Sequence, residues 1–242
     1  MIADKHAVVT GGGRGIGLAI ARALMERGAR VSVISRSLDE TGDDFRRVRA
    51  DVADEVQITR AFAVCREENG PIAILVNNAG IAQSAPFKRT DKAMWDRIIG
   101  TNLTGTYFCT RQVIDEMLAA KWGRIINIAS MAGLYGAAYI SAYAASKHGV
   151  MGLTRSIAAE IEGSGVTVNA ICPGYTESDM MQSAIANIVK RTGLSEELAR
   201  HELAKTNPGG RIVTADEVAA ATVALCESND NGAKIILPQL SS

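Results

Sequence analysis

Short runs of apolar, largely β-branched residues alternate along the chain with longer stretches whose apolar residues recur at helical spacing. The first run, residues 6–9, is followed by glycines and then by a helical pattern over residues 16–27, which Gly28 ends. Further strands are predicted at residues 31–34, 47–50, 74–76, 124–128, 166–171 and 235–237. This alternation predicts an α/β fold with a doubly wound parallel sheet of about seven strands and helices on both faces.

One long insertion interrupts the alternation before the last predicted helix. It covers residues 175–208 and contains two helical patterns, at residues 179–191 and 195–205. Such insertions often cover a binding site, so residues 175–208 are predicted to form a substrate lid. The 242 residues contain no repeat and no linker at which the chain divides, so we expect a single domain over residues 1–242.

Charge and cysteine content narrow the class of protein. Lys plus Arg and Asp plus Glu number 26 each, so no overall field would attract nucleic acid or an anionic membrane. No apolar run reaches the roughly 18 residues that span a bilayer, and the first residues fit neither a signal nor a transit peptide, so a cytoplasmic protein is expected. The cysteines show no CxxC spacing and predict reduced, mostly buried thiols and no metal site. They are Cys65, Cys109, Cys172 and Cys226.

The turn after the first predicted strand reads TGGGRGIG, from Thr10 to Gly17. Glycines at 11, 15 and 17 would let the backbone turn tightly and approach a pyrophosphate at the N-terminus of the next helix. A purely structural turn is the alternative for a glycine pattern alone. The strand before it and the helix after it favour a Rossmann-type dinucleotide site.

A phenol and an ammonium are paired later in the chain. Tyr143 and Lys147 are four residues apart, which places them on one face of a helix, and an ammonium near a phenol eases proton transfer. A surface tyrosine and lysine would be the alternative for this pair alone. Ser130 lies thirteen residues upstream at the end of the predicted strand in RIINIAS, where an open α/β sheet places its ligand, and it favours a catalytic site.

Together these motifs resemble the short-chain dehydrogenase/reductase family over nearly the whole chain. The matching motifs occur in the family's order and are residues 10–17, Asp51-Val52, Asn77-Asn78-Ala79-Gly80, Asn102, Ser130, the YxxxK motif of residues 143–147, and Pro173-Gly174. Residues 207–226 further resemble bacterial 3-oxoacyl reductases that act on carrier-protein or CoA thioesters, and aromatic polyketide ketoreductases. Within that segment Thr214 and Glu217 form a capping box, so helix initiation also explains its sequence.

The resemblance implies roles for four catalytic residues. Ser130 would hydrogen-bond the substrate oxygen, Tyr143 would donate or accept the proton, and Lys147 would bind the nicotinamide ribose and lower the pKa of Tyr143. Asn102 would hold a water in the proton relay. The alternative for Asn102 is a helix-start residue, since asparagine is a good N-cap.

A larger set of residues is expected to contact the cofactor. Asp51 would lie near the adenine; the alternative is an acid at a helix start. The NNAG segment would approach the adenosine, with Asn77 fixing the strand end. The alternative for NNAG is a plain turn. Besides Tyr143 and Lys147, the expected cofactor contacts are Gly11, Arg14, Gly15, Ile16, Gly17, Ser35, Arg36, Asp51, Val52, Asn78, Ala79, Gly80, Pro173, Gly174 and Ser178.

The end of the second strand indicates which cofactor is used. NAD enzymes of this fold place a carboxylate there for the ribose hydroxyls, whereas this chain has Ser35 followed by Arg36, a cation suited to a 2′-phosphate. Arg14 is a second candidate cation, and both arginines have the alternative of being solvated surface residues. Asp39 and Glu40 argue for NAD. The balance favours NADP(H), with NAD(H) as the alternative.

The resulting hypothesis is an NADP(H)-dependent enzyme that reduces a 3-oxoacyl thioester or a similar ketone. An NAD-dependent dehydrogenase of a hydroxy acid or cyclic alcohol is the second hypothesis, and a nucleotide-binding sensor without turnover is the third. Family members pair through the helices expected near Asn102 and Ala142, so a homotetramer or homodimer is expected. A buried face inside the monomer is the alternative explanation for part of the small and apolar pattern on these helices. The chain departs from the family at its end, where Pro238, Gln239 and Leu240 replace the usual DGG. Six residues are candidates for lining an apolar substrate pocket, with burial in the core as the alternative. They are Met131, Leu134, Tyr135, Tyr139, Tyr175 and Met180.

Overall fold

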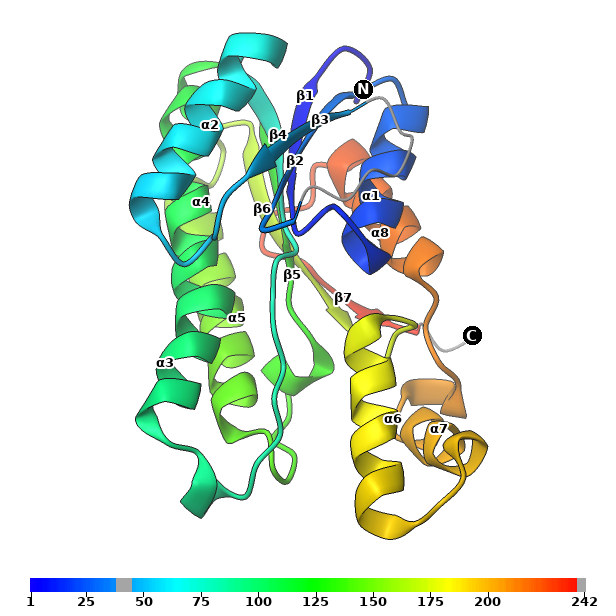
Figure 1. The fold of residues 1–242 in the computed structure, drawn as a ribbon. Coiled ribbons are helices and arrows are strands. Elements are labelled where there is room, and N and C mark those ends of the chain that lie inside the picture. Colours follow the sequence, from blue (N-terminus) through cyan, green and yellow to red (C-terminus); the bar gives the residue numbers. More distant parts are fainter. Residues whose placement is uncertain (38–44, 239–242) are drawn as a thin grey trace.

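A computed structural model describes residues 1–37 and 45–238 and contains the predicted seven-stranded parallel sheet (Figure 1). The strands are β1 (His6–Thr10), β2 (Arg30–Ser35), β3 (Arg46–Arg49), β4 (Ile72–Asn77), β5 (Gly123–Ile128), β6 (Val166–Pro173) and β7 (Lys234–Leu237). Their order is β3-β2-β1-β4-β5-β6-β7, and each neighbouring pair is parallel. The order reverses between β1 and β4, and in an open α/β sheet the crevice at such a reversal is where ligands bind.

Helices cover both faces of the sheet (Figure 1). They are α1 (Gly15–Glu26), α2 (Glu55–Asn69), α3 (Lys92–Ile99), α4 (Gly105–Ala119), α5 (Ser141–Glu160), α6 (Asp179–Thr192), α7 (Glu196–Lys205) and α8 (Ala215–Glu227), with short turns η1 (Phe87–Arg89), η3 (Met131–Gly133) and η4 (Pro208–Gly210). Neighbouring β1 residues point to opposite faces. Val9 packs in the core under α1 and α8, and Val8 packs in the core under α2 and α4. The sheet is therefore buried on both sides, as its continuous apolar strands predict.

A π-helical segment, η2 (Gly100–Thr104), joins α3 to α4 without a break. Asn102 lies inside this segment, so the interpretation of Asn102 as a helix-start residue is wrong. Asp91 performs that role instead, since its carboxylate accepts a hydrogen bond of 2.8 Å from the Met94 amide. π-Helical turns inside α-helices frequently occur at functional sites.

Other local predictions are confirmed. All four cysteines are free and buried, and Thr214 and Glu217 form the capping box at the start of α8. In the part of the chain that the structure describes, every helix is too short or too polar to cross a bilayer. Asp39, Glu40, Gln239 and Leu240 lie outside the described residues.

Candidate active site

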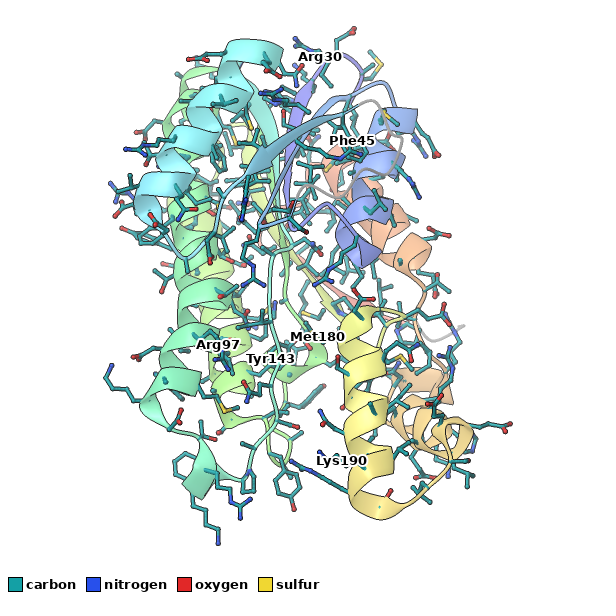
Figure 2. The ribbon with its side chains drawn as sticks, viewed as in Figure 1. Arg30, Phe45, Arg97, Tyr143, Met180 and Lys190 are labelled. Atoms are coloured by element: carbon teal, nitrogen blue, oxygen red, sulfur yellow. The ribbon has the colours of Figure 1, made fainter. Side chains whose placement is uncertain are left out.

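A cavity of about 1150 Å³ opens at the carboxyl ends of the central strands, beside the reversal in strand order. All the residues expected to act in catalysis or to contact the cofactor line this cavity except Asn102, which is buried behind its wall. Figure 2 shows Tyr143 on α5 and Met180 on α6 on opposite sides of it. The fold therefore brings the predicted catalytic and cofactor residues, spread over most of the sequence, to one place.

The glycine loop between β1 and α1 has the shape that a pyrophosphate requires. Gly11 and Gly15 have φ values of 65° and 51°, in the left-handed region that favours glycine. No side chain among the described residues caps α1, whose N-cap is Arg14, so the first amides of the helix can donate to a bound anion. The loop fits the pyrophosphate of a dinucleotide.

The same loop is packed tightly against the end of β4. The Asn78 amide group donates hydrogen bonds of 3.0 Å to the Thr10 carbonyl and 3.1 Å to the Gly11 carbonyl. A Cβ atom on Gly17 would lie 2.3 Å from the Gly11 oxygen and 2.4 Å from Asn78 Nδ2. Gly17 is therefore required by close backbone packing, and the asparagine of the NNAG segment holds the loop rather than forming a plain turn.

Ser35 and Arg36 lie at the end of the cavity beyond the glycine loop. Ser35 ends β2, and the exposed Arg36 follows it. Asp51 lines the same cavity, and its carboxylate accepts a 3.0 Å hydrogen bond from the Ala53 amide. The N-cap of α2 is Asp54, so the interpretation of Asp51 as a helix-start acid is wrong.

Arg14 is paired across the mouth of the cavity. Its Nη1 atom lies 2.9 Å from Oδ2 of Asp179, in the first turn of α6, and both side chains are 72% exposed. An ion pair this exposed adds little stability, but it connects the glycine loop to the insertion of residues 175–208. Nothing in the sequence pattern predicted this pair, because the two residues are 165 positions apart (179 − 14).

Lys147 is fixed by the end of β5. Its Nζ atom donates a 2.8 Å hydrogen bond to the Ile128 carbonyl and lies 5.8 Å from the centre of the Tyr143 ring. Burial lowers the pKa of the Lys147 ammonium to about 8. The ammonium therefore lies beside the phenol, as the four-residue spacing predicts.

The pKa of Tyr143 differs from the expectation that Lys147 lowers it. Burial raises the pKa of the phenol, and a hydrogen bond with the Ser130 hydroxyl opposes that rise. The phenol is thus protonated at neutral pH and can act as an acid. Ser130 is itself fixed, since its Oγ accepts a 3.1 Å hydrogen bond from the Ala132 amide.

Asn102 supports the site from behind its wall. Its side chain is buried: Oδ1 accepts a 2.8 Å hydrogen bond from the Ile81 amide, and Nδ2 donates to the Ile81 carbonyl at 2.9 Å and to Ser146 Oγ at 3.0 Å. The π-helical segment is thereby tied both to the loop after β4 and to α5, next to Lys147. This geometry positions the residues that line the cavity.

Asn77 connects the strands just before they reach the cavity. Its Nδ2 donates to Asn127 Oδ1 at 2.9 Å and to Thr110 Oγ1 at 3.1 Å, and Asn127 in turn donates to Thr154 at 2.9 Å. The four buried side chains join β4, α4, β5 and α5. Asn77 therefore fixes the strand end, as the resemblance implies.

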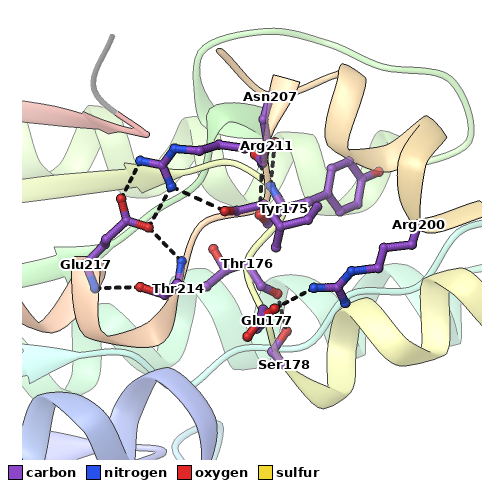
Figure 3. Close-up of polar contacts among 10 residues, drawn as sticks. Tyr175, Thr176, Glu177, Ser178, Arg200, Asn207, Arg211, Thr214 and Glu217 are labelled. Carbon is purple, nitrogen blue, oxygen red and sulfur yellow. Dashed lines mark hydrogen bonds and ion pairs between the residues drawn. The ribbon is translucent and has the colours of Figure 1, made fainter. Parts of the chain in front are cut away.

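The base of the insertion is closed by a residue that sequence reasoning missed (Figure 3). Asn207 is buried; its Oδ1 accepts a 2.7 Å hydrogen bond from the Tyr175 amide, and its Nδ2 donates to the carbonyls of Tyr175 at 2.9 Å and Arg211 at 2.7 Å. The first residue of the insertion and its next-to-last residue are thus joined beside Gly174. The sole signal in the sequence was an asparagine before a Pro-Gly-Gly turn.

Ser178 and most of the expected apolar residues line the cavity. Ser178 lines the cavity and caps α6, where its Oγ accepts from the Met181 amide at 3.2 Å. Leu134 packs against the core instead of the cavity. The expected pocket residues that do line the cavity are Met131, Tyr135, Tyr139, Tyr175 and Met180. Residues 1–37 and 45–238 contain no cluster of three or more metal-ligating side chains.

The chain matches the short chain dehydrogenase family over residues 5–188. It is 37% identical to the D-beta-hydroxybutyrate dehydrogenase of Rhizobium meliloti (strain 1021), covering 96% of this chain and 94% of the relative. It is 38% identical to the granaticin polyketide synthase putative ketoacyl reductase 1 of Streptomyces violaceoruber, covering 90% of this chain and 85% of the relative. A crystal structure of a variant of actinorhodin polyketide ketoreductase with NADPH superimposes with a TM-score of 0.91 at 34% identity, covering 96% of this chain and 95% of that one.

Proposed function

Because this chain belongs to the short-chain dehydrogenase/reductase family, whose members oxidise alcohols or reduce carbonyls, we propose that it is an NADP(H)-dependent reductase of a 3-oxoacyl thioester or related ketone. One observation supports this proposal most strongly. Ser130, Tyr143 and Lys147 line the same cavity as the glycine loop, and the helix α1 that follows this loop has no side-chain cap among the described residues. Residues 175–208 act as the substrate lid of a single catalytic domain.

The three side chains divide the chemistry between them. A dinucleotide held at the glycine loop would supply the hydride for the new C–H bond at the carbonyl carbon. Ser130 donates a hydrogen bond to the carbonyl oxygen, and Tyr143 transfers its phenolic proton to that oxygen, so that the ketone becomes a secondary alcohol. Lys147 stabilises the phenolate that remains on Tyr143.

The side chains near Ser130 favour a neutral ketone over a short hydroxy acid. A carboxylate close to the reacting carbon would need a cationic partner. Among the described residues, the cations that line the cavity are Arg14, Arg36, Lys147 and Arg191, of which only Lys147 contacts the reaction centre. The lining residues that adjoin Ser130 and Tyr143 in the sequence are small or apolar: Met131, Ala132 and Ile140.

Replacing Arg36 with alanine tests the choice of cofactor. We expect the Kd of NADPH to rise about 10- to 100-fold, because a charge-assisted contact with the 2′-phosphate is lost, and the Kd of NADH to change less than about 3-fold. Nicotinamide fluorescence in side-by-side titrations measures both. Arg49, which ends β3 outside the cavity wall, provides the matched control variant.

Equal or tighter binding of NADH by the unmodified protein would contradict the NADP(H) assignment. In that case Asp39 or Glu40 becomes the candidate ribose contact, and an NAD-dependent alcohol dehydrogenase becomes the preferred function. The 37% identity to a hydroxybutyrate dehydrogenase supports this second candidate.

The protein is also proposed to act in the cytoplasm as a homodimer or homotetramer. Tyr107 on α4 is 42% exposed and lies beside Phe108, which supports pairing through that helix.

A further inference from the structure

The cavity continues past the reaction centre along one face of α6. Met180, Ala184, Ile188 and Arg191 line it in succession, at the three- and four-residue spacing that places side chains on a single helix face. At 1.5 Å per residue, Met180 and Arg191 are separated by roughly 16 Å along the helix axis. The wall of the cavity therefore extends along α6 from Met180 to Arg191.

The wall along α6 mixes apolar and polar side chains. Ala184 and Ile188 line the same cavity as Tyr135 and Tyr139. Polar residues lie among them and beyond them on the helix, and these are Ser183, Asn187, Arg191 and Thr192.

Arg191 differs from the other cations of the insertion. Arg200 pairs with Glu177, and Lys205 pairs with Glu202. Arg191 is exposed, lines the cavity and forms no ion pair with any residue in the two described ranges. Lys190, labelled in Figure 2, is its neighbour on α6 but does not line the cavity.

We propose that Arg191, with Asn187 beside it, binds the phosphate at the far end of an extended thioester arm, that is, the phosphopantetheine of CoA or of a carrier protein. The inference rests on the proposed reduction of a 3-oxoacyl thioester. In phosphopantetheine about thirteen bonds separate the sulfur from the phosphorus. An extended polypeptide spans about 3.5 Å for every three backbone bonds, so the extended arm is roughly 15 Å long. This length matches the distance along α6, and a guanidinium is well suited to a phosphate.

The test compares acetoacetyl-pantetheine with its 4′-phosphate as substrates, with saturating NADPH. For the unmodified protein we expect the KM of the phosphorylated thioester to be lower by about 10-fold, the effect of one charge-assisted contact. Arg191→Ala is expected to bring the KM ratio close to 1, and Lys190→Ala to leave the ratio as in the unmodified protein. Adding acetoacetyl-CoA and an acetoacetyl carrier protein distinguishes the two sources, since the true substrate shows the lower KM.

A ratio near 1 in the unmodified protein, or one that survives Arg191→Ala, would overturn the subsite. If neither thioester is reduced, the proposed function fails, and binding of CoA to the NADPH-loaded protein then decides the subsite alone. Binding by the unmodified protein that is weakened in Arg191→Ala and kept in Lys190→Ala supports it. Binding that is absent, or equal in all three proteins, refutes it.

Discussion

Replacing Tyr143 with phenylalanine is expected to lower kcat for ketone reduction by about 10³- to 10⁴-fold, the contribution of a positioned general acid. The substitution removes the phenolic oxygen and its proton but keeps the half-buried ring, so the Kd of NADPH should stay within about 2-fold. Loss of NADPH absorbance measures the rate, and fluorescence titration measures the binding. A matched control is Tyr107→Phe, which removes the same oxygen from α4, outside the cavity wall.

Full activity in Tyr143→Phe would contradict the catalytic assignment and leave a nucleotide-binding sensor as the better account.

The pH dependence provides a second check on the unmodified protein. Lys147 carries its charge below a pKa of about 8 and loses it as the pH rises through that value, which removes the stabilisation of the Tyr143 phenolate. Reduction should therefore slow above about pH 8.

Replacing Gly17 with alanine is expected to raise the Kd of the dinucleotide by about 100-fold or more. The added Cβ would lie 2.3 Å from the Gly11 oxygen and 2.4 Å from Asn78 Nδ2, so the loop must move away from β4. The amides at the start of α1 then lose their position around the pyrophosphate, and each charged hydrogen bond lost costs about 1.5–3 kcal/mol. Fluorescence titration with NADPH measures the effect, and a melting curve confirms that the variant is folded.

Gly13 offers the control within the same loop. A Cβ on Gly13 would lie 3.4 Å from Ser35 Oγ, an ordinary contact, and Gly13 occupies a variable position of the TGxxxGxG pattern. Gly13→Ala should therefore bind NADPH much more tightly than Gly17→Ala. Equal losses in the two variants would show that the close packing of Gly17 against Gly11 does not determine cofactor binding.

The sequence was sufficient for the sheet and for the lining of the site because both depend on local patterns. Apolar periodicity identified the strands, and YxxxK placed Tyr143 and Lys147 on one helix face, as α5 confirms. The position of Ser130 at the end of β5 followed from the same periodicity. Each of these inferences needed only residues close together in the chain or a general rule for open α/β sheets.

What the sequence did not predict depends on tertiary packing. The π-helical segment around Asn102 has no pattern of its own, and the Asn207 side chain contacts Tyr175, a residue 32 positions away. The direction of the pKa shift of Tyr143 depends on burial, which the YxxxK spacing does not report. The pairing of Arg14 with Asp179 likewise requires the folded insertion.

We propose that this protein moves a hydride onto a ketone carbon. To test this, NADPH carrying deuterium at C4 of the nicotinamide is supplied with acetoacetyl-CoA as substrate, and mass spectrometry locates the label in the product. We expect one deuterium on the carbinol carbon of the 3-hydroxyacyl product and no label transfer in Tyr143→Phe over the same time. The label is placed in turn on each of the two faces of C4. If neither labelled NADPH gives a deuterated product with the unmodified protein, or if no product forms, the reduction of a 3-oxoacyl thioester is contradicted.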